Sequence, residues 1–229
     1  MKVLLSVLFC VALISPAAQA ENEKVRVGFV NALAPWVIPE SNSGILVELL
    51  EQTLQAAGYG ISRNYYPYAR RIVEYKLGRL DVICDINQVI IDSEKLDGFY
   101  SGDVYAYQNF AFALKDRGFD FKQVSDLTGV SLMSWQGATV RLGDEYAKMA
   151  KQNLRYQEVA DQALQVKMLL GRVEVVQMDL EIFKYYLAEV GALGRFDAAR
   201  EVERFPLFGK SRNGFMFRKR EHRTPFSLS

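Results

Sequence analysis

The chain has 229 residues, of which 50% are hydrophobic and 24% charged, and its formal net charge is +1. This composition is typical of a folded globular protein with enough apolar residues for two small cores, and it excludes a disordered chain. Because basic and acidic residues nearly balance, no overall charge attracts nucleic acid or an anionic membrane, and we expect no nucleic-acid partner.

The first 20 residues have the pattern of a secretory signal. Lys2 precedes a mostly apolar run over residues 3–14, and Ala18-Gln19-Ala20 places small residues just before Glu21. The run is shorter than the ~20 residues that cross a bilayer, so it predicts a signal peptide that is cleaved after Ala20. We therefore expect a periplasmic protein.

Residues 21–106 predict a first α/β lobe. Alternating or β-branched runs favour strands at 24–30, 61–66 and 82–85, and apolar spacing of 3.6 residues favours helices at 46–57 and 68–77. Strand, helix, strand, helix, strand is the order of a parallel sheet.

Residues 107–202 predict a second lobe, entered through an extended aromatic-rich segment at 104–114. Strands are expected at 129–133, 154–159 and 175–179, and helices from Gly137 to Met149, from Asp161 to the residue before Gly171, and over 180–190. Short strands at 202–205 and 214–218 are expected to return to lobe 1, which would then include residues 203–229.

A sequence pattern occurs twice, once in each predicted lobe. Gly78-Arg79-Leu80-Asp81 and Gly171-Arg172-Val173-Glu174 each stand between a helix and an apolar strand, and these strands end in Asp85 and Asp179. Glycine is the residue that most easily ends a helix in the left-handed region. Since ligands of open α/β sheets bind outside the carboxyl ends of the strands, we expect both carboxylates to line a cleft between the lobes.

Signatures of catalysis are weak in this sequence. His222, the one histidine, lies near a polar C-terminus, where a solvated surface histidine is expected, so a catalytic triad or a multi-histidine metal site is poorly supported. The glycines are not grouped as in phosphate or dinucleotide sites. We expect no catalytic residue, no metal and no cofactor.

Three residues before a predicted helix suit an anion. Gly137, Ala138 and Thr139 present backbone N–H groups and a hydroxyl at a positive helix end. Arg70 or Arg71 could also reach an anion, and the alternative for each is a surface charge.

Other side chains suit a cation. Asp179 could hold an ammonium group, or it could simply cap the helix that follows it. Trp36, Tyr66 and Tyr68 follow strands of lobe 1, where flat rings could cover a ligand or could equally pack in the core or hinge.

The chain resembles the family 3 periplasmic solute-binding proteins, the polar amino-acid receptors of ABC uptake systems. The resemblance covers nearly everything after the signal and rests on four segments in order: Gly44-Ile45-Leu46-Val47-Glu48-Leu49-Leu50, Gly78-Arg79-Leu80-Asp81-Val82, Asp126-Leu127-Thr128-Gly129-Val130 leading to Gly137-Ala138-Thr139, and Gly171-Arg172-Val173-Glu174-Val175-Val176 ending at Asp179. It implies a type II periplasmic binding fold, with two lobes that are each a mostly parallel sheet flanked by helices, joined by two hinge strands. It also implies closure over a small polar, amino-acid-like solute that passes to an ABC permease of the inner membrane, and we expect a monomer.

Carried over by position, the resemblance implies that Thr139 and its neighbouring amides hold a ligand carboxylate, that Asp179 holds the α-ammonium and that Trp36 covers the ligand side chain. The chain departs from the family where a Thr-x-Glu-Arg segment usually supplies a carboxylate-binding arginine, because it has Ile91-Asp92-Ser93-Glu94-Lys95 there. Lysine lacks the planar fork, so either the ligand is not a standard amino acid or Arg70 or Arg71 takes this place.

A second departure follows Phe217-Arg218-Lys219, where the family continues into a helix that packs on lobe 1. That helix is expected to be missing, which would expose apolar surface on lobe 1 and lower stability. Two other functions stay open: an enzyme on the same fold, similar to cyclohexadienyl dehydratases, and a sensory or partner-binding module that is not tied to transport.

Overall fold

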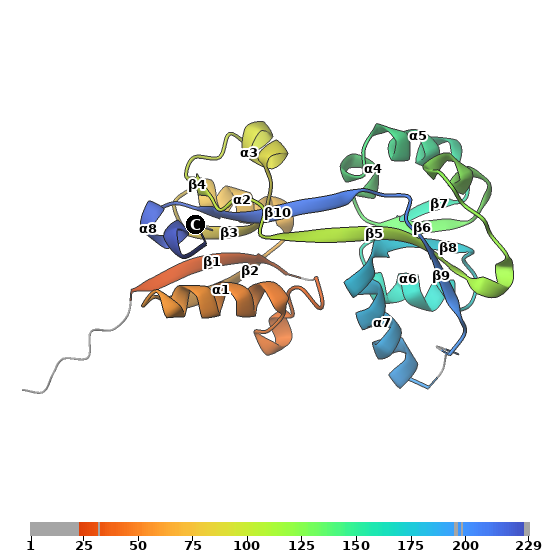
Figure 1. The fold of residues 1–229 in the computed structure, drawn as a ribbon, viewed down its shortest axis with the longest axis horizontal. Helices are drawn as coiled ribbons and strands as arrows, with labels where there is room; N and C mark the ends of the chain where they lie inside the picture. Colours follow the sequence, from red (N-terminus) through yellow and green to blue (C-terminus); the bar gives the residue numbers. More distant parts are fainter. Residues whose placement is uncertain (1–22, 32, 195–196, 198, 227–229) are drawn as a thin grey trace, which may run out of the picture.

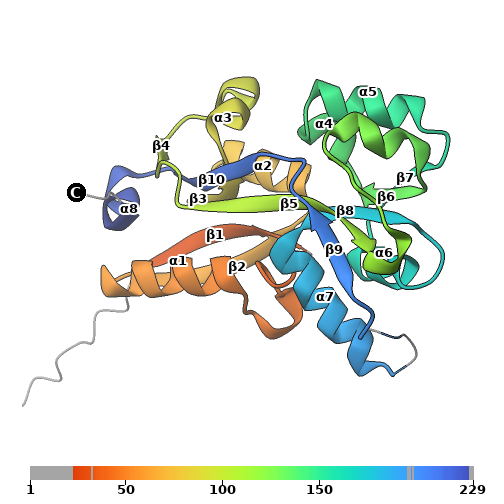
Figure 2. The same ribbon diagram turned by 45° about the vertical axis from the view of Figure 1, so that its right-hand side comes forward.

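Two lobes joined by two long strands make up the protein (Figure 1). The computed structural model describes residues 23–31, 33–194, 197 and 199–226, so the predicted signal peptide lies outside the described residues. The bridging strands are β5 (Tyr105–Leu114) and β10 (Lys210–Phe217), which run between the lobes in both views (Figures 1 and 2). The predicted two-lobed α/β fold is confirmed.

Lobe 1 is built on a parallel sheet. The strand β1 (Lys24–Val30) lies between β2 (Gly60–Tyr66) and β3 (Val82–Ile86) and is parallel to both. The connecting helices are α1 (Ile45–Ala56) and α2 (Tyr68–Lys76), as the βαβ order requires. The smaller elements are η1 (Pro39–Ser41), α3 (Gln88–Glu94), β4 (Phe99–Tyr100), α8 (Arg220–Arg223) and η4 (Thr224–Phe226).

Lobe 2 repeats this design. The strand β6 (Leu132–Trp135) lies between β7 (Tyr156–Val159) and β8 (Val175–Asp179), parallel to both, and β9 (Val202–Phe205) pairs with β5. The other elements are η2 (Lys115–Arg117), η3 (Val124–Gly129), α4 (Ala138–Arg141), α5 (Asp144–Gln152), α6 (Gln162–Leu169) and α7 (Leu180–Ala192). Every residue of β3 and β8 is buried, which explains why both strands begin with apolar residues on both faces rather than alternating.

The bridging strands divide their pairing between the lobes. Residues 105–108 of β5 pair with residues 210–213 of β10. The rest of β5, residues 109–113, pairs with β8 of lobe 2. The rest of β10, residues 214–217, pairs with β3 of lobe 1. The strands β3 and β8 are therefore separated by β10 and β5 rather than adjacent. Asp85 near the end of β3 and Asp179 at the end of β8 both contact residues 105–109 of β5.

The return to lobe 1 begins at Lys210, not at residue 203 as predicted. The strand β9 pairs with residues 111–114 of β5 and so belongs to lobe 2. The helix predicted from Gly137 to Met149 is also divided, because Gly143 has φ of 89° between α4 and α5. Left-handed backbone cannot continue an α-helix, so the two pieces are separate.

The end of the described chain folds back on lobe 1. Phe226 is buried, and its ring centroid lies 5.3 Å from that of Phe215 and 5.1 Å from that of Phe217. The apolar surface expected there is thus covered in part, although Leu77 on the same lobe is 58% exposed. Within the described residues, the helices are all too short or too polar to cross a membrane.

Candidate ligand site at the lobe junction

Side chains from both lobes meet around residues 105–108 of β5, and we call this region the lobe junction. Its members form one continuous set of contacts: Trp36, Tyr68, Arg71 and Asp85 of lobe 1, Tyr105, Tyr107 and Gln108 of β5, and Arg141 and Asp179 of lobe 2. The two strand-end carboxylates predicted from the repeat, Asp85 and Asp179, therefore reach the same segment.

Asp179 is held by donors from both lobes. Its Oδ1 accepts hydrogen bonds from Trp36 Nε1 at 3.1 Å and from the backbone N–H groups of Glu181 at 3.0 Å and Ile182 at 3.3 Å, and its Oδ2 accepts one from Gln108 N at 2.8 Å. Burial raises the pKa of Asp179, while these hydrogen bonds lower it in part. The residue thus caps α7 and also keeps acceptor capacity on Oδ2, since a carboxylate oxygen can take two donors.

Asp85 is paired within lobe 1. Its Oδ2 lies 3.1 Å from Arg71 Nη1, and its Oδ1 accepts hydrogen bonds from Tyr105 Oη, at 2.8 Å, and from Tyr107 Oη. Burial and the nearby Asp85 carboxylate raise the pKa values of both tyrosines, so both hydroxyls stay protonated donors. Asp85 has φ of 51°, a strained region for a residue with a side chain, and strain of this kind clusters at functional sites.

The two neighbouring arginines have different roles. Arg71 is fully buried beside Asp85, whereas Arg70 is exposed and pairs with Glu74 on its own helix. The surface alternative therefore holds for Arg70 and is wrong for Arg71. Among the described residues, Nε and Nη2 of Arg71 have no hydrogen-bond partner.

Aromatic rings line the contact between the lobes. Trp36 packs edge-on against Tyr107, with centroids 4.9 Å apart, and at 5.9 Å from Tyr105. The guanidinium of Arg141, from α4 of lobe 2, lies 3.9 Å from the centroid of the Tyr68 ring of lobe 1. Trp36 is buried and Tyr68 half-buried, and each contacts lobe 2: Trp36 through Asp179 and Tyr68 through Arg141.

The predicted anion turn already binds a carboxylate, and it is the protein's own. Glu158 Oε2 accepts a hydrogen bond from Gly137 N at 2.7 Å, and Glu158 Oε1 accepts from Thr139 N at 3.0 Å, Thr139 Oγ1 at 2.9 Å and Tyr156 Oη at 2.9 Å. Burial opposes the ionisation of Glu158, but these hydrogen bonds lower its pKa below the ordinary value. Ala138, between the two donors, is fully buried.

Sequence reasoning missed Tyr105, Tyr107, Gln108 and Arg141 of the lobe junction, and Glu158 at the turn of residues 137–139. The sequence could have indicated the two tyrosines, because Tyr105 and Tyr107 are two residues apart in a predicted strand and so lie on the same face. Arg141 could not be found locally, because its partner Tyr68 lies in the other lobe, and Glu158 meets Gly137 and Thr139 only through the folding of lobe 2.

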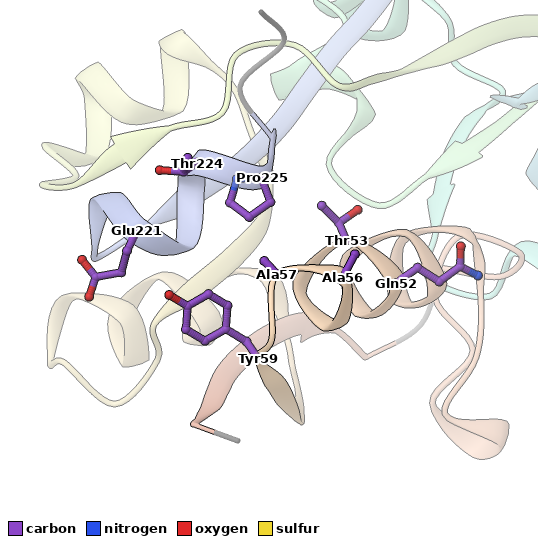
Figure 3. Close-up of a pocket in the computed structure, with 8 residues that line it drawn as sticks. All are labelled: Gln52, Thr53, Ala56, Ala57, Tyr59, Glu221, Thr224 and Pro225. Carbon is purple, nitrogen blue, oxygen red and sulfur yellow. The ribbon is translucent and has the colours of Figure 1, made fainter. Parts of the chain in front are cut away.

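A groove lies elsewhere, on lobe 1 between α1 and the segment α8–η4 (Figure 3). It has a volume of about 720 Å³ and is lined by Gln52, Thr53, Ala56, Ala57, Tyr59, Glu221, Thr224 and Pro225. None of the predicted site residues belongs to it. Within the described part of the chain, no three His, Cys, Asp or Glu residues are grouped to hold a metal ion.

The prediction that His222 is a solvated surface residue is wrong. The residue is 1% exposed and its ring packs edge-on against Tyr59, with centroids 4.9 Å apart, so the expected surface histidine is a buried one. Burial lowers its pKa below the ordinary value. The neutral imidazole serves as part of the packing beside α8.

No model of a known protein family matches the chain, and no curated protein sequence is similar to it. Solved structures are similar in fold. An ancestral arginine-binding protein bound to arginine has a TM-score of 0.65 at 16% identity, covering 90% of this chain and 91% of that one. The arginine-, lysine-, histidine-binding protein ArtJ from Geobacillus stearothermophilus has a TM-score of 0.63 at 16% identity, covering 89% of this chain and 88% of that one. A histidine kinase sensor domain with similarity to periplasmic binding proteins has a TM-score of 0.68 at 15% identity, covering 90% of this chain and 88% of that one.

These likenesses define the class of fold: the chain has a periplasmic binding protein-like fold over nine-tenths of its length. At this level of identity they establish the fold alone.

Proposed function

We propose that the protein is an extracytoplasmic receptor, related to the family 3 solute-binding proteins, that captures a small polar solute bearing an amine between its lobes and passes it to an ABC permease without a catalytic step. The observation that carries this proposal is Asp179, a buried carboxylate at the lobe junction whose Oδ2 accepts, among the described residues, one hydrogen bond, from Gln108 N. The fold neighbours include proteins described as bound to arginine or glutamine.

Hinge closure explains how such a receptor binds. A solute that touches both lobes only in the closed form favours that form by the difference in contact energy. Trp36 and Asp179 lie on opposite lobes, and their Nε1 and Oδ1 atoms are 3.1 Å apart. A solute bound beside these two groups would therefore contact both lobes only when the lobes are closed.

A sensory module is the second candidate function, and the likeness to a histidine kinase sensor domain favours it. The ligand chemistry at Asp179 is the same in both cases. A permease that takes up the bound solute from this protein in vesicles would support transport, whereas ligand binding without uptake would support sensing. An enzyme on this fold is a weaker candidate, and turnover of prephenate or arogenate by the purified protein would establish it.

The test of the binding proposal starts with a thermal-shift screen of amino acids, polyamines and organic acids, followed by calorimetry of the solutes that stabilise the protein. Asp179→Asn removes the charge and keeps a helix-capping oxygen, so it should weaken binding of an amine at least about tenfold. Its NH2 group cannot accept from Gln108 N, so a loss of about 1–3 kcal/mol in stability is expected, and affinity is compared below the melting temperature of the variant. Asp161→Asn makes the same change at the exposed cap of α6 and should leave affinity unaltered. Unchanged affinity in Asp179→Asn would remove this residue from the site.

A further inference from the structure

We infer that Glu158 determines ligand specificity: it fills the anion-binding turn of lobe 2 with an internal carboxylate, so that the receptor selects organic amines without a carboxylate over the corresponding α-amino acids. This inference rests on the proposed function and names the substrate class of the same site. It depends on where Glu158 lies, what holds it, and which groups of the lobe junction then remain for a ligand.

Glu158 lies at the ligand edge of the lobe 2 sheet. It pairs in register with Ser134 of β6, one residue before the end of both strands, and Ser134 in turn pairs with Gln177 of β8, two residues before Asp179. Because β6, β7 and β8 are parallel, their carboxyl ends share one edge, so Glu158 and Asp179 belong to the same rim.

The turn has little left to offer an incoming carboxylate. Glu158 accepts hydrogen bonds from the amides of Gly137 and Thr139 and from the Thr139 hydroxyl. A ligand carboxylate would have to displace all of these bonds while facing a like charge. Juxtaposed like charges are a strong means of rejecting a ligand.

The remaining groups favour a cation. In the described residues, neither Glu158 nor Asp179 forms an ion pair with a basic side chain, since both are held by neutral donors. Arg71 is fully buried and pairs with Asp85, so the charge of its guanidinium is balanced inside lobe 1. Asp179, at the Nε1 edge of Trp36, and Glu158 therefore give this edge of the lobe 2 sheet two carboxylates. Arg141, the basic residue of lobe 2 at the junction, is turned to the ring of Tyr68 instead, so the two carboxylates suit an ammonium group.

Matched pairs of ligands test this inference directly. Agmatine and arginine, cadaverine and lysine, and putrescine and ornithine differ within each pair by one carboxylate. In calorimetry the wild-type protein should bind the amine of at least one pair about tenfold or more tighter than the amino acid. Glu158→Ala, which frees the amides, should lower that ratio at least about tenfold, mainly by improving amino-acid binding.

Two further variants separate charge from packing. Glu158→Gln keeps an oxygen acceptor for the turn but removes the charge. Its preference for the amine over the amino acid should therefore fall between those of the wild type and Glu158→Ala. Glu174→Gln is the matched control, because Glu174 likewise accepts a backbone N–H and a hydroxyl, both from Ser131, but at the opposite end of β8. It should leave the preference unchanged.

The outcomes are distinguishable. A wild-type protein that prefers the amino acid in every pair, or a Glu158→Gln variant that folds and keeps the wild-type ratio, overturns the role of Glu158. Binding of some other solute but no member of any pair overturns the amine class and leaves the receptor function standing. A protein that binds nothing in the solute screen overturns the proposed function itself.

Discussion

The buried ion pair between Arg71 and Asp85 shows how one residue fixes the geometry of the lobe junction. Arg71 is wholly buried and Asp85 almost so, with Nη1 and Oδ2 3.1 Å apart, and Asp85 in turn orients the hydroxyls of Tyr105 and Tyr107. An ion pair of this kind costs desolvation energy to form, but removing one partner leaves a buried charge uncompensated.

We therefore predict that Arg71→Met lowers the free energy of unfolding by about 3 kcal/mol, measured by urea denaturation. The double variant Arg71→Met/Asp85→Asn should recover a large part of this loss, because it removes the orphaned charge. Asparagine tolerates the positive φ of position 85 and still accepts hydrogen bonds from the tyrosines. A double variant that is less stable than Arg71→Met alone would show that the unpaired carboxylate is not the source of the loss.

Which residues of the site could be predicted depends on how local their signal is. Asp179 could be identified because it ends an apolar strand. Its predicted role as a helix cap is confirmed and it lies at the lobe junction, whereas its binding of an ammonium group stays a prediction. The sequence could not distinguish Arg70 from Arg71, since adjacent helical positions differ by only 100° in direction. Glu158 could not be predicted at all, because its donors come from a turn about 20 residues earlier in the chain.

At the scale of elements, the acids of the repeated pattern join neighbouring strands. Asp81 accepts a hydrogen bond from the backbone N–H of Arg26 in β1 at 2.9 Å and also pairs with its guanidinium, and Glu174 accepts one from the backbone N–H of Ser131, just before β6, at 2.7 Å. In each lobe the repeat thus fixes the start of a buried strand against the adjacent one.

These contacts predict a pH dependence of stability. Burial acts against ionisation of Asp81, but hydrogen bonds from Arg26 bring its pKa below the ordinary value, and hydrogen bonds from Ser131 lower the pKa of Glu174. A depressed folded-state pKa adds stability that is complete above the unfolded value, about 4, and is lost as pH falls through the folded value. The unfolding free energy should therefore fall on acidification below about pH 4, and Asp81→Asn should make this fall shallower while costing about 1 kcal/mol at pH 7.

Asp126→Asn serves as the control for that measurement. Asp126 also has a lowered pKa, through hydrogen bonds from the backbone of Lys122 and Gln123, but these bonds close a local turn on the surface. Asp126→Asn should change the slope of the unfolding free energy against pH, measured below about pH 4, less than Asp81→Asn does. Equal slopes in the wild type and Asp81→Asn would contradict the assigned role of Asp81.

Element boundaries were harder to predict than element types. Gly78 takes the left-handed conformation expected of a helix end, with φ of 75°, whereas Gly171 ends its helix without it. The turn after α6 instead closes with the N–H groups of Arg172 and Val173 on the carbonyl of Met168. The glycine therefore marked the correct place for a different physical reason, which the sequence pattern alone does not distinguish.

At the scale of the whole molecule, the sequence predicts two lobes but not how the chain passes between them. The strand β9 is a short strand of four residues, and only its pairing with residues 111–114 of β5 places it in lobe 2. Such pairing is non-local, and a short apolar run carries no information about its partner. The crossing is made by β10, whose first half has an exposed, polar pattern.

Two contacts between the lobes favour the closed arrangement: the Trp36–Asp179 hydrogen bond and the placement of Arg141 over the Tyr68 ring. A cation–π contact at an exposed arginine contributes up to about 1 kcal/mol, which corresponds to a change of about fivefold in the ratio of closed to open molecules. We predict that Arg141→Ala shifts the ligand-free protein towards an open form with a larger radius of gyration in small-angle X-ray scattering, and that saturating ligand restores the compact form. Arg204→Ala removes a similar contact within lobe 2, over Phe110 at 5.4 Å, and should leave the radius unchanged. Equal scattering from the wild type and both variants would mean that Arg141 has no part in closure, because only a contact that spans the two lobes can bias their separation.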